Sequence, residues 1–186
     1  AGQTGNLPET EIEPLETLPE MEELDTDQRV AAGERAMQRT AIIKLNGGLG
    51  TGMGMQKAKS LLRVKDGLTF LDIIAGQARQ SGVPLVLMNS FSTRDDSLQA
   101  LAYHDGLPGN LPRDFLQHKV PKVQCDDLAP ASCDHDPGLS WCPPGHGDLY
   151  TALITSGMLE TLLEVGYRYA FVSNADNLGA VVDPTI

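Results

Sequence analysis

The stretch that decides the fold is residues 40–60, which read TAIIKLNGGLGTGMGMQKAKS. Its first four residues form a short, mostly β-branched run, which predicts a buried strand. Five glycines follow where a parallel strand would give way to a loop, together with Lys57 and Lys59. Glycine lets backbone N–H groups approach phosphate oxygens closely, and lysine adds mobile positive charge. The pattern therefore favours a phosphate-binding loop over a plain flexible turn.

Two common nucleotide-binding fingerprints do not fit this loop. A P-loop requires glycines at the positions that Met53 and Ala58 occupy. The dinucleotide motif G-x-G-x-x-G fails as well, because Met53 or Met55 replaces its third glycine, depending on which glycine begins the count. Another class of nucleotide-binding loop is therefore needed.

Length and charge narrow the classes of function. With 186 residues, the chain is long enough for one domain with a sizeable core. It has 25 Asp and Glu against 14 Lys and Arg, a net charge of -11, which argues against a nucleic-acid or anionic-membrane surface. No apolar run approaches the roughly 18 residues of a membrane span, and the sequence does not start like a secretory signal. We therefore expect a cytoplasmic protein.

The three cysteines, Cys125, Cys133 and Cys142, are widely spaced. Their spacing matches neither a zinc ligand set nor a disulfide framework. We expect free thiols.

Strands and helices alternate after the loop. Thr69 and Asp72 form a capping-box pattern, which predicts a helix from Thr69 through about Gln80. Residues 84–88 form the next apolar run and predict a second buried strand. With the strand near residues 40–45, these elements predict a βαβ unit with a right-handed crossover.

Further elements are expected on both sides of this unit. Upstream, the acidic, proline-punctuated N-terminal residues predict a loosely attached leader, followed by a short helix over residues 24–39. Between about residues 104 and 141 prolines recur and periodicity is lost, which indicates an irregular insertion. The other expected elements are a helix from Thr93, capped with Asp96, to Tyr103; a short strand near residues 115–117; a helix over residues 149–165; and a strand over residues 169–173. The helix over residues 149–165 should have Leu159 and Leu163 on its apolar face and should end at Gly166.

Four segments resemble, in order, the UTP–glucose-1-phosphate uridylyltransferases, also called UDP-glucose pyrophosphorylases. Four ordered matches are far more specific than one, and the resemblance runs from about residue 44 to the C-terminus. The segments are residues 44–60 with the following DGLTFLD of residues 66–72, residues 84–91 (PLVLMNSF), residues 143–150 (PPGHGDLY) and residues 173–182 (SNADNLGAVV).

The resemblance implies a doubly wound α/β fold with a mostly parallel sheet, of the nucleotide-diphospho-sugar transferase type (Rossmann-like and GT-A-like). Residues 1–39 would then be an acidic leader with a short helix. Residues 40–186 would form the N-terminal part of a nucleotidyltransferase domain. Family members continue further, with the rest of the catalytic sheet and a C-terminal β-helix, so we expect a fragment that is poorly active alone.

Site residues follow from the resemblance, position by position. Asp176 follows a predicted strand and should lie opposite the glycine–lysine loop, where it would hold Mg²⁺, although an Asx turn is nearly as good a local interpretation. His146 alone reads as a solvated loop residue, and Asp148 is best interpreted as a helix cap. The implied assignments are Leu45, Asn46, Gly47 and Gly48 for the triphosphate; Lys59 as the catalytic lysine on the α-phosphate and leaving group; Gln117 and Gly145 for the uracil base; and His146 and Asn174 for the sugar phosphate.

The implied reaction joins UTP and glucose 1-phosphate to give UDP-glucose and pyrophosphate. Such a transfer depends on positioning and charge neutralisation rather than on an acid–base pair. A pyrophosphorylase for another sugar 1-phosphate, giving UDP-N-acetylglucosamine or a broad range of UDP-sugars, is one alternative. A non-catalytic nucleotide-binding module is another, although Lys59 and Asp176 together argue against it.

Overall fold

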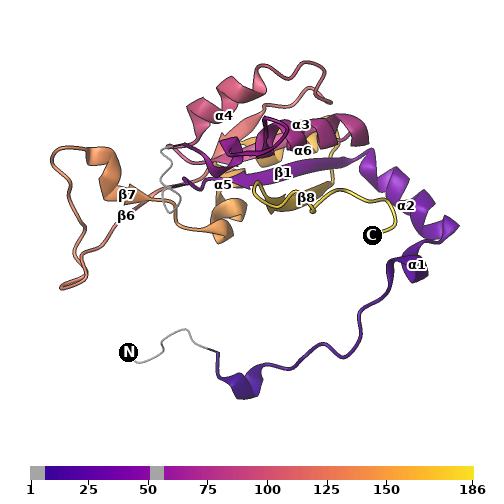
Figure 1. Cartoon of the computed structure of the whole chain (residues 1–186), viewed down its shortest axis with the longest axis horizontal. Helices are drawn as coiled ribbons and strands as arrows, with labels where there is room; N and C mark the ends of the chain where they lie inside the picture. The colour runs from indigo at the N-terminus through magenta and orange to yellow at the C-terminus, as the bar shows by residue number, and fades with distance from the viewer. Residues whose placement is uncertain (1–6, 51–56) are drawn as a thin grey trace.

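A four-stranded parallel sheet forms the centre of the computed structural model, which describes residues 7–50 and 57–186. Its strands lie in the order β5-β4-β1-β8, and every neighbouring pair is parallel. Figure 1 shows β1 and β8 side by side. Their bounds are Thr40–Asn46 for β1, Leu85–Asn89 for β4, Asp114–Leu116 for β5 and Tyr169–Asn174 for β8. The chain moves outward from β1 to β4 and β5, then returns to place β8 on the other side of β1. The carboxyl ends of β1 and β8 are therefore the switch point, where open α/β sheets collect ligands.

Alternate residues of the central strands enter two separate cores. Ile42 and Leu87 pack with the helix α3 (Phe70–Ser81) on one face of the sheet. Ile43 and Met88 pack on the other face with two later helices, α5 (Leu149–Thr155) and α6 (Met158–Val165). Helices thus cover both faces, which confirms the doubly wound α/β class.

The segment from β1 to β4 agrees with the predicted βαβ unit. A short hairpin of β2 (Arg63–Lys65) and β3 (Leu68–Thr69) precedes α3. Thr69 Oγ1 accepts from the N–H of Asp72 at 3.1 Å, and the Asp72 carboxylate accepts from the N–H of Thr69 at 2.7 Å, so the predicted capping box is confirmed. Gly82, with φ of 70°, ends the helix in the left-handed conformation that glycine favours.

The prediction of a second capping box, at Thr93 and Asp96, is wrong. The helix α4 (Arg94–Leu101) does begin after Thr93, but among the described residues the Thr93 hydroxyl makes no cap bond. It accepts from the N–H of Ser90 at 3.0 Å and lies 3.2 Å from the Ser90 hydroxyl. Thr93 is fully buried, so its hydroxyl instead closes the turn between β4 and α4.

The prediction of a single helix over residues 149–165 is also wrong. The structure has α5 and α6 there, separated at Gly157 with φ of 76°. The break rotates the second helix, so Met158 and Leu162 are buried there while the expected Leu159 and Leu163 are exposed. Gly166, with φ of 103°, ends α6 as predicted.

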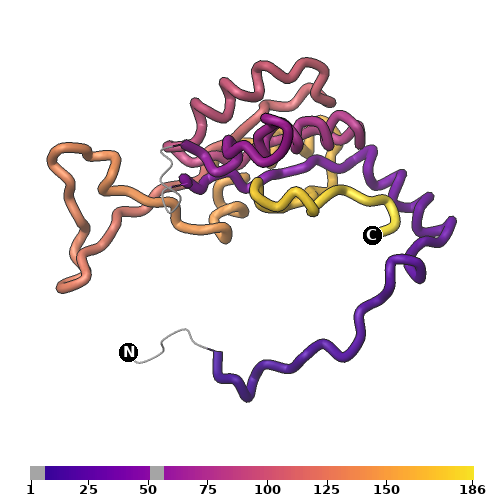
Figure 2. Tube along the Cα trace, viewed as in Figure 1, coloured from indigo at the N-terminus to yellow at the C-terminus, as the bar shows by residue number. Residues whose placement is uncertain are grey.

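The N-terminal region contains two short helices where one was expected. Two helices, α1 (Met21–Leu24) and α2 (Asp27–Met37), replace the single helix expected over residues 24–39, because Thr26 starts a new helix by accepting from the N–H of Arg29. Gly33 lies where the backbone of Pro184 crosses α2, so a Cβ there would overlap the Pro184 carbonyl. The described part of the leader, with a 3₁₀ turn at Glu9–Glu11, is exposed and runs apart from the sheet (Figure 2).

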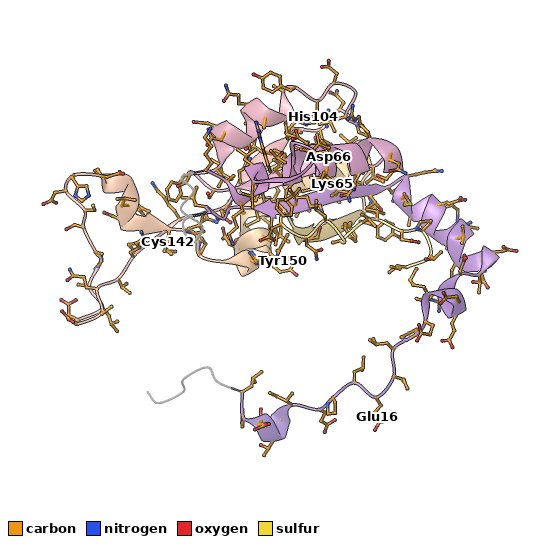
Figure 3. The ribbon with its side chains drawn as sticks, in the orientation of Figure 1. Glu16, Lys65, Asp66, His104, Cys142 and Tyr150 are labelled. Carbon is orange, nitrogen blue, oxygen red and sulfur yellow. The ribbon has the colours of Figure 1, made fainter. Side chains whose placement is uncertain are left out.

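The part of the irregular insertion that follows β5, residues 120–142, projects as an arm, whereas β5 belongs to the central sheet. Its base is a two-stranded hairpin of β6 (Val120–Pro121) and β7 (Trp141–Cys142), with a 3₁₀ turn at Pro137–Ser140 before β7. Cys142 marks this base in Figure 3. Lys119 Nζ lies 4.7 Å from the centroid of Trp141 and 5.6 Å from that of Phe91, which joins the hairpin to the loop after β4.

Candidate functional site

A pocket lies at the switch point, at the carboxyl ends of β1 and β8. Its volume is about 280 Å³, near the lower end of the roughly 300–1,000 Å³ of small-molecule sites. All the residues assigned from the sequence line it, together with three that were not assigned. The lining residues are Leu45, Asn46, Gly47, Gly48, Lys59, Ser60, Gln117, Pro143, Gly145, His146, Asn174, Ala175 and Asp176.

One side of the pocket, which we call the strand wall, consists of residues 45–48, 59–60 and 174–176. The ladder between β1 and β8 continues past the strand end, where Ala175 donates its N–H to the Leu45 carbonyl at 3.1 Å. This bond places the turn after β8 beside the glycines after β1. The proximity that the sequence predicted for the two strand ends is therefore present.

The side chain of Asn46 is engaged in hydrogen bonds within the fold. Its side chain is buried, and Nδ2 donates to Asn89 Oδ1 at 2.7 Å and to Ser97 Oγ at 2.8 Å. Asn89 Nδ2 in turn donates to Asp114. The side-chain amide of Asn46 thus connects β1 to β4 and α4.

The lysine that the sequence assigned is held against the glycine turn. Lys59 begins the 3₁₀ turn at Lys59–Leu61, and its N–H donates to the Gly48 carbonyl at 3.1 Å. A β-bridge between Leu49 and Ala58 closes the two ends of the glycine-rich segment. The rest of that segment, including Gly52, Met53, Gly54 and Met55, lies outside the described residues.

Lys59 and Asp176 face each other at the mouth of the pocket. Lys59 Nζ lies 3.9 Å from Asp176 Oδ2, and each side chain is 46% exposed. An ion pair this exposed contributes roughly 0–1 kcal/mol, so a bound phosphate and a cation can separate it at little cost. The pair therefore offers one positive and one negative group to a charged ligand.

The other side, which we call the loop wall, consists of Gln117, Pro143, Gly145 and His146. Gln117 follows β5 and is 8% exposed, and its N–H donates to the Asn89 carbonyl at 2.9 Å. Its side-chain amide lies directly against Gly47, where a Cβ would overlap it. Within residues 7–50 and 57–186, Gln117 Nε2 has no hydrogen-bond partner.

The turn that carries Gly145 and His146 leads into α5. Gly145 has a φ of 115°, which side chains other than glycine rarely adopt, and a 3₁₀ turn at His146–Asp148 follows. Asp148 occupies the N-cap position, but within the described ranges its side chain does not make the expected capping bond to the helix backbone. Its carboxylate instead accepts from the N–H of His118 and from the Thr151 hydroxyl.

Ser60, Pro143 and Ala175 line the pocket without having been assigned from the sequence. Ser60 is the most informative of them, because it is fully buried and its hydroxyl has no partner in the part of the chain that the structure describes. An unpaired buried hydroxyl is costly, which makes Ser60 an unusual position in the pocket lining. Its position directly after Lys59 was a signal that the sequence offered.

The chemistry of the donor set fits one kind of metal site. Among the residues that the structure places, no group of three or more His, Cys, Asp or Glu side chains could hold an ion. Asp176 can supply one exposed carboxylate, as suits Mg²⁺, which takes one or two carboxylates and binds substrate phosphates for the remainder.

As expected, the three cysteines are free thiols. No helix among the described residues is both long and apolar enough to cross a membrane.

The parallel sheet, with its glycine turn and its lysine beside a carboxylate at the switch point, is that of an α/β protein of the nucleotide-sugar transferase type. Comparison with known proteins identifies the family within this class. The family profile described as UTP–glucose-1-phosphate uridylyltransferase matches residues 2–186. The chain belongs to this family.

Individual relatives agree with the family match. The chain is 42% identical over 160 residues to the UTP–glucose-1-phosphate uridylyltransferase of Solanum tuberosum, covering 82% of this chain and 33% of the relative. It is 43% identical over 154 residues to that of Saccharomyces cerevisiae, covering 79% and 31%. The chain thus spans about a third of the length of these relatives.

Solved structures show the same fold. The UDP-glucose phosphorylase of Trypanosoma brucei superposes with a TM-score of 0.84 at 43% identity, covering 99% of this chain and 40% of that one. A point mutant of the UDP-glucose pyrophosphorylase of Leishmania major, solved in complex with UDP-glucose, superposes with a TM-score of 0.77 at 42% identity. The match covers 99% of this chain and 39% of that one.

Proposed function

We propose that the chain is the nucleotide-binding part of a uridylyltransferase that joins UTP and glucose 1-phosphate to give UDP-glucose and pyrophosphate. The observation that carries the proposal is the convergence of Lys59, Asp176 and Gln117 on one pocket at the switch point. Residues 40–186 would then form part of a nucleotidyltransferase domain, with residues 1–39 as an attached leader. The cytoplasmic location expected from the sequence stays a prediction.

The strand wall would take the triphosphate. Its backbone at Gly47 and Gly48 lies at the end of β1, where N–H dipoles can meet phosphate oxygens. Lys59, held beside Gly48, would neutralise charge that grows on the α-phosphate and on the leaving pyrophosphate. Asp176 would hold Mg²⁺, which when bound supplies charge neutralisation between the phosphates.

The loop wall would take the base and the incoming sugar phosphate. Gln117 offers a buried donor without a partner among the described residues, together with an acceptor, which matches the imide edge of uracil. Gly145 would approach the base through its backbone. His146 and Asn174, both exposed at the pocket, would contact the phosphate of glucose 1-phosphate and align its oxygen for in-line attack.

Calorimetric titration of the chain with UTP and with ATP, each with and without Mg²⁺, tests the proposal. We expect weak binding of UTP, with a Kd of roughly 0.1–1 mM (about -5 to -4 kcal/mol), because the pocket is small. Mg²⁺ should strengthen it, UDP-glucose should compete with it, and ATP should bind less tightly. Equal binding of UTP and ATP, or no binding of UTP at millimolar concentration, would contradict the proposal for this chain.

A further inference from the structure

His118, the residue after Gln117, is held by the carboxylate of Asp148. The backbone N–H of His118 donates to Asp148 Oδ2 at 2.6 Å, and the ring Nδ1 lies 2.7 Å from Asp148 Oδ1. The Asp148 side chain is 9% exposed. A buried carboxylate accepts both bonds from one residue, so it fixes the backbone and the ring of His118 together.

Two threonines of α5 complete this network. The Thr151 hydroxyl donates to Asp148 Oδ1 at 2.7 Å, and Thr155 Oγ1 lies 3.0 Å from His118 Nε2. Burial raises the pKa of Asp148, but the hydrogen bonds from Thr151 and His118 outweigh it, so the pKa lies below its ordinary value. The carboxylate is therefore ionised at neutral pH and remains a hydrogen-bond acceptor.

The network joins the two segments of the loop wall. Gln117 directly precedes His118, and Asp148 closes the turn that begins at Gly145, donating its N–H to the Gly145 carbonyl at 3.2 Å. These segments lie 30 residues apart in the sequence. The contact between Asp148 and His118 thus fixes the position of Gln117 relative to Gly145.

The position of Gln117 matters because its amide has two possible orientations. Uracil presents an acceptor and an N–H donor on its pairing edge, whereas cytosine presents an amino donor and an acceptor. An amide that is free to rotate can pair with either base. An amide held in one orientation, against Gly47 on one side, distinguishes them.

We propose that Asp148 and His118 form a positioning pair that holds Gln117 for uracil and thereby sets the discrimination of UTP from CTP. The inference rests on the proposed function of the pocket. Neither residue lines the pocket, so both act through Gln117 and Gly145.

A ratio of affinities tests this role. Kd values for UTP and CTP are measured by calorimetry in the presence of Mg²⁺ for the wild type, Asp148→Asn, His118→Ala and His118→Asn. We expect the preference for UTP to fall about tenfold in Asp148→Asn and His118→Ala. His118→Asn should recover most of it, because its side-chain N–H can replace Nδ1. Equal weakening of both nucleotides would mean that the pair only stabilises the fold and would overturn the proposal.

The chain provides a matched control. His104 Nε2 lies 2.8 Å from Asp72 Oδ1, a second histidine–carboxylate pair, on the face that α3 and α4 cover (Figure 3). This pair does not line the nucleotide pocket. His104→Ala should leave the ratio of the two Kd values unchanged.

A measurement without nucleotide separates this inference from the proposed function. The side-chain NH₂ resonances of Gln117 are recorded by NMR in the wild type and in Asp148→Asn. We expect distinct, dispersed resonances in the wild type and a shift toward unstructured glutamine in the variant; unchanged resonances would overturn the inference. If the wild type binds neither UTP nor CTP, the proposed function fails, and the NMR comparison still decides whether the pair positions Gln117.

Discussion

The two walls of the pocket are built in different ways. In the strand wall, residues 45–48 and 174–176 continue two neighbouring parallel strands, and backbone hydrogen bonds fix their position. In the loop wall, Gln117 follows β5 and has one backbone hydrogen bond to Asn89, whereas Gly145 lies in an irregular segment that the hydrogen bonds of Asp148 join to His118. Under the proposed function, charge binding would therefore depend on the sheet itself, whereas base recognition would depend on a few polar side chains.

The comparison first predicts that Lys59 contributes more to UTP affinity than any other single side chain. Its removal takes away a charge-assisted contact worth about 1.5–3 kcal/mol, so Lys59→Ala should weaken UTP binding roughly 10- to 100-fold in calorimetry. Lys57→Ala, two residues away and exposed, is the matched control and should bind almost as the wild type does. Equal losses in both variants would show that only general positive charge matters.

The contact between the walls gives a second prediction. A Cβ at Gly47 would overlap the Gln117 amide, so Gly47→Ala should displace it and weaken UTP binding about tenfold, an overpacking cost of about 1.4 kcal/mol. CTP should lose less than UTP, because the amide no longer selects uracil. At the neighbouring Gly48 the added carbon would lie 3.8 Å from Lys59 Cδ, an ordinary contact. A Gly48→Ala variant that loses as much selectivity as Gly47→Ala would argue against this coupling.

The contribution of Asp148 to the free energy of unfolding should decrease at acid pH. Because its pKa is lowered in the folded state, its ionised form stabilises the fold above the unfolded pKa of about 3.9. That contribution is lost as pH falls through the folded value. Asp148→Asn should therefore lower the free energy of unfolding by about 1–3 kcal/mol at pH 7, with a smaller difference from the wild type at pH 3. Urea unfolding at the two pH values measures it, and a difference independent of pH would contradict this account.

The smallest effect is expected at the arm. Lys119 lies over the rings of Trp141 and Phe91, so Lys119→Met should lower stability by about 0.5–1 kcal/mol. Trp141 is the single tryptophan of the chain, and its fluorescence reports the change directly. Lys122→Met is the control, and UTP affinity should not change in either variant. A loss of UTP affinity in Lys119→Met would mean that the loop wall extends to the arm.

The same contrast explains what the sequence could predict. The apolar runs that became β1, β4 and β8, and the capping box at Thr69, are local patterns, and the structure confirms them. The strand wall followed, because parallel strands end at one edge of the sheet. Gln117 had no local signal, and its assignment depended on the family resemblance alone.

Each wrong prediction has a physical cause that the structure shows. The break at Gly157 turned α6 so that Met158 and Leu162, not Leu159 and Leu163, face the core, and helical periodicity does not contain that information. Thr93 matches the pattern of a helix cap, but its hydroxyl accepts from the N–H of Ser90 in a buried turn instead. The Asp148 carboxylate bonds to His118, 30 residues away in the sequence, instead of capping the helix. Of these three causes, the Asp148 contact is long-range, whereas the other two lie within the local backbone, at a left-handed glycine and at a turn that spans three residues.

An NMR titration of backbone and side-chain amides with two partial ligands, uridine and tripolyphosphate, tests the division of labour between the walls most directly. At millimolar concentrations, with Mg²⁺ present, tripolyphosphate should shift Gly47, Gly48 and Lys59. Uridine should shift Gln117 and Gly145, and UTP should shift both sets. Shifts of the same residues by both partial ligands, or no shift in this pocket with UTP, would contradict the account.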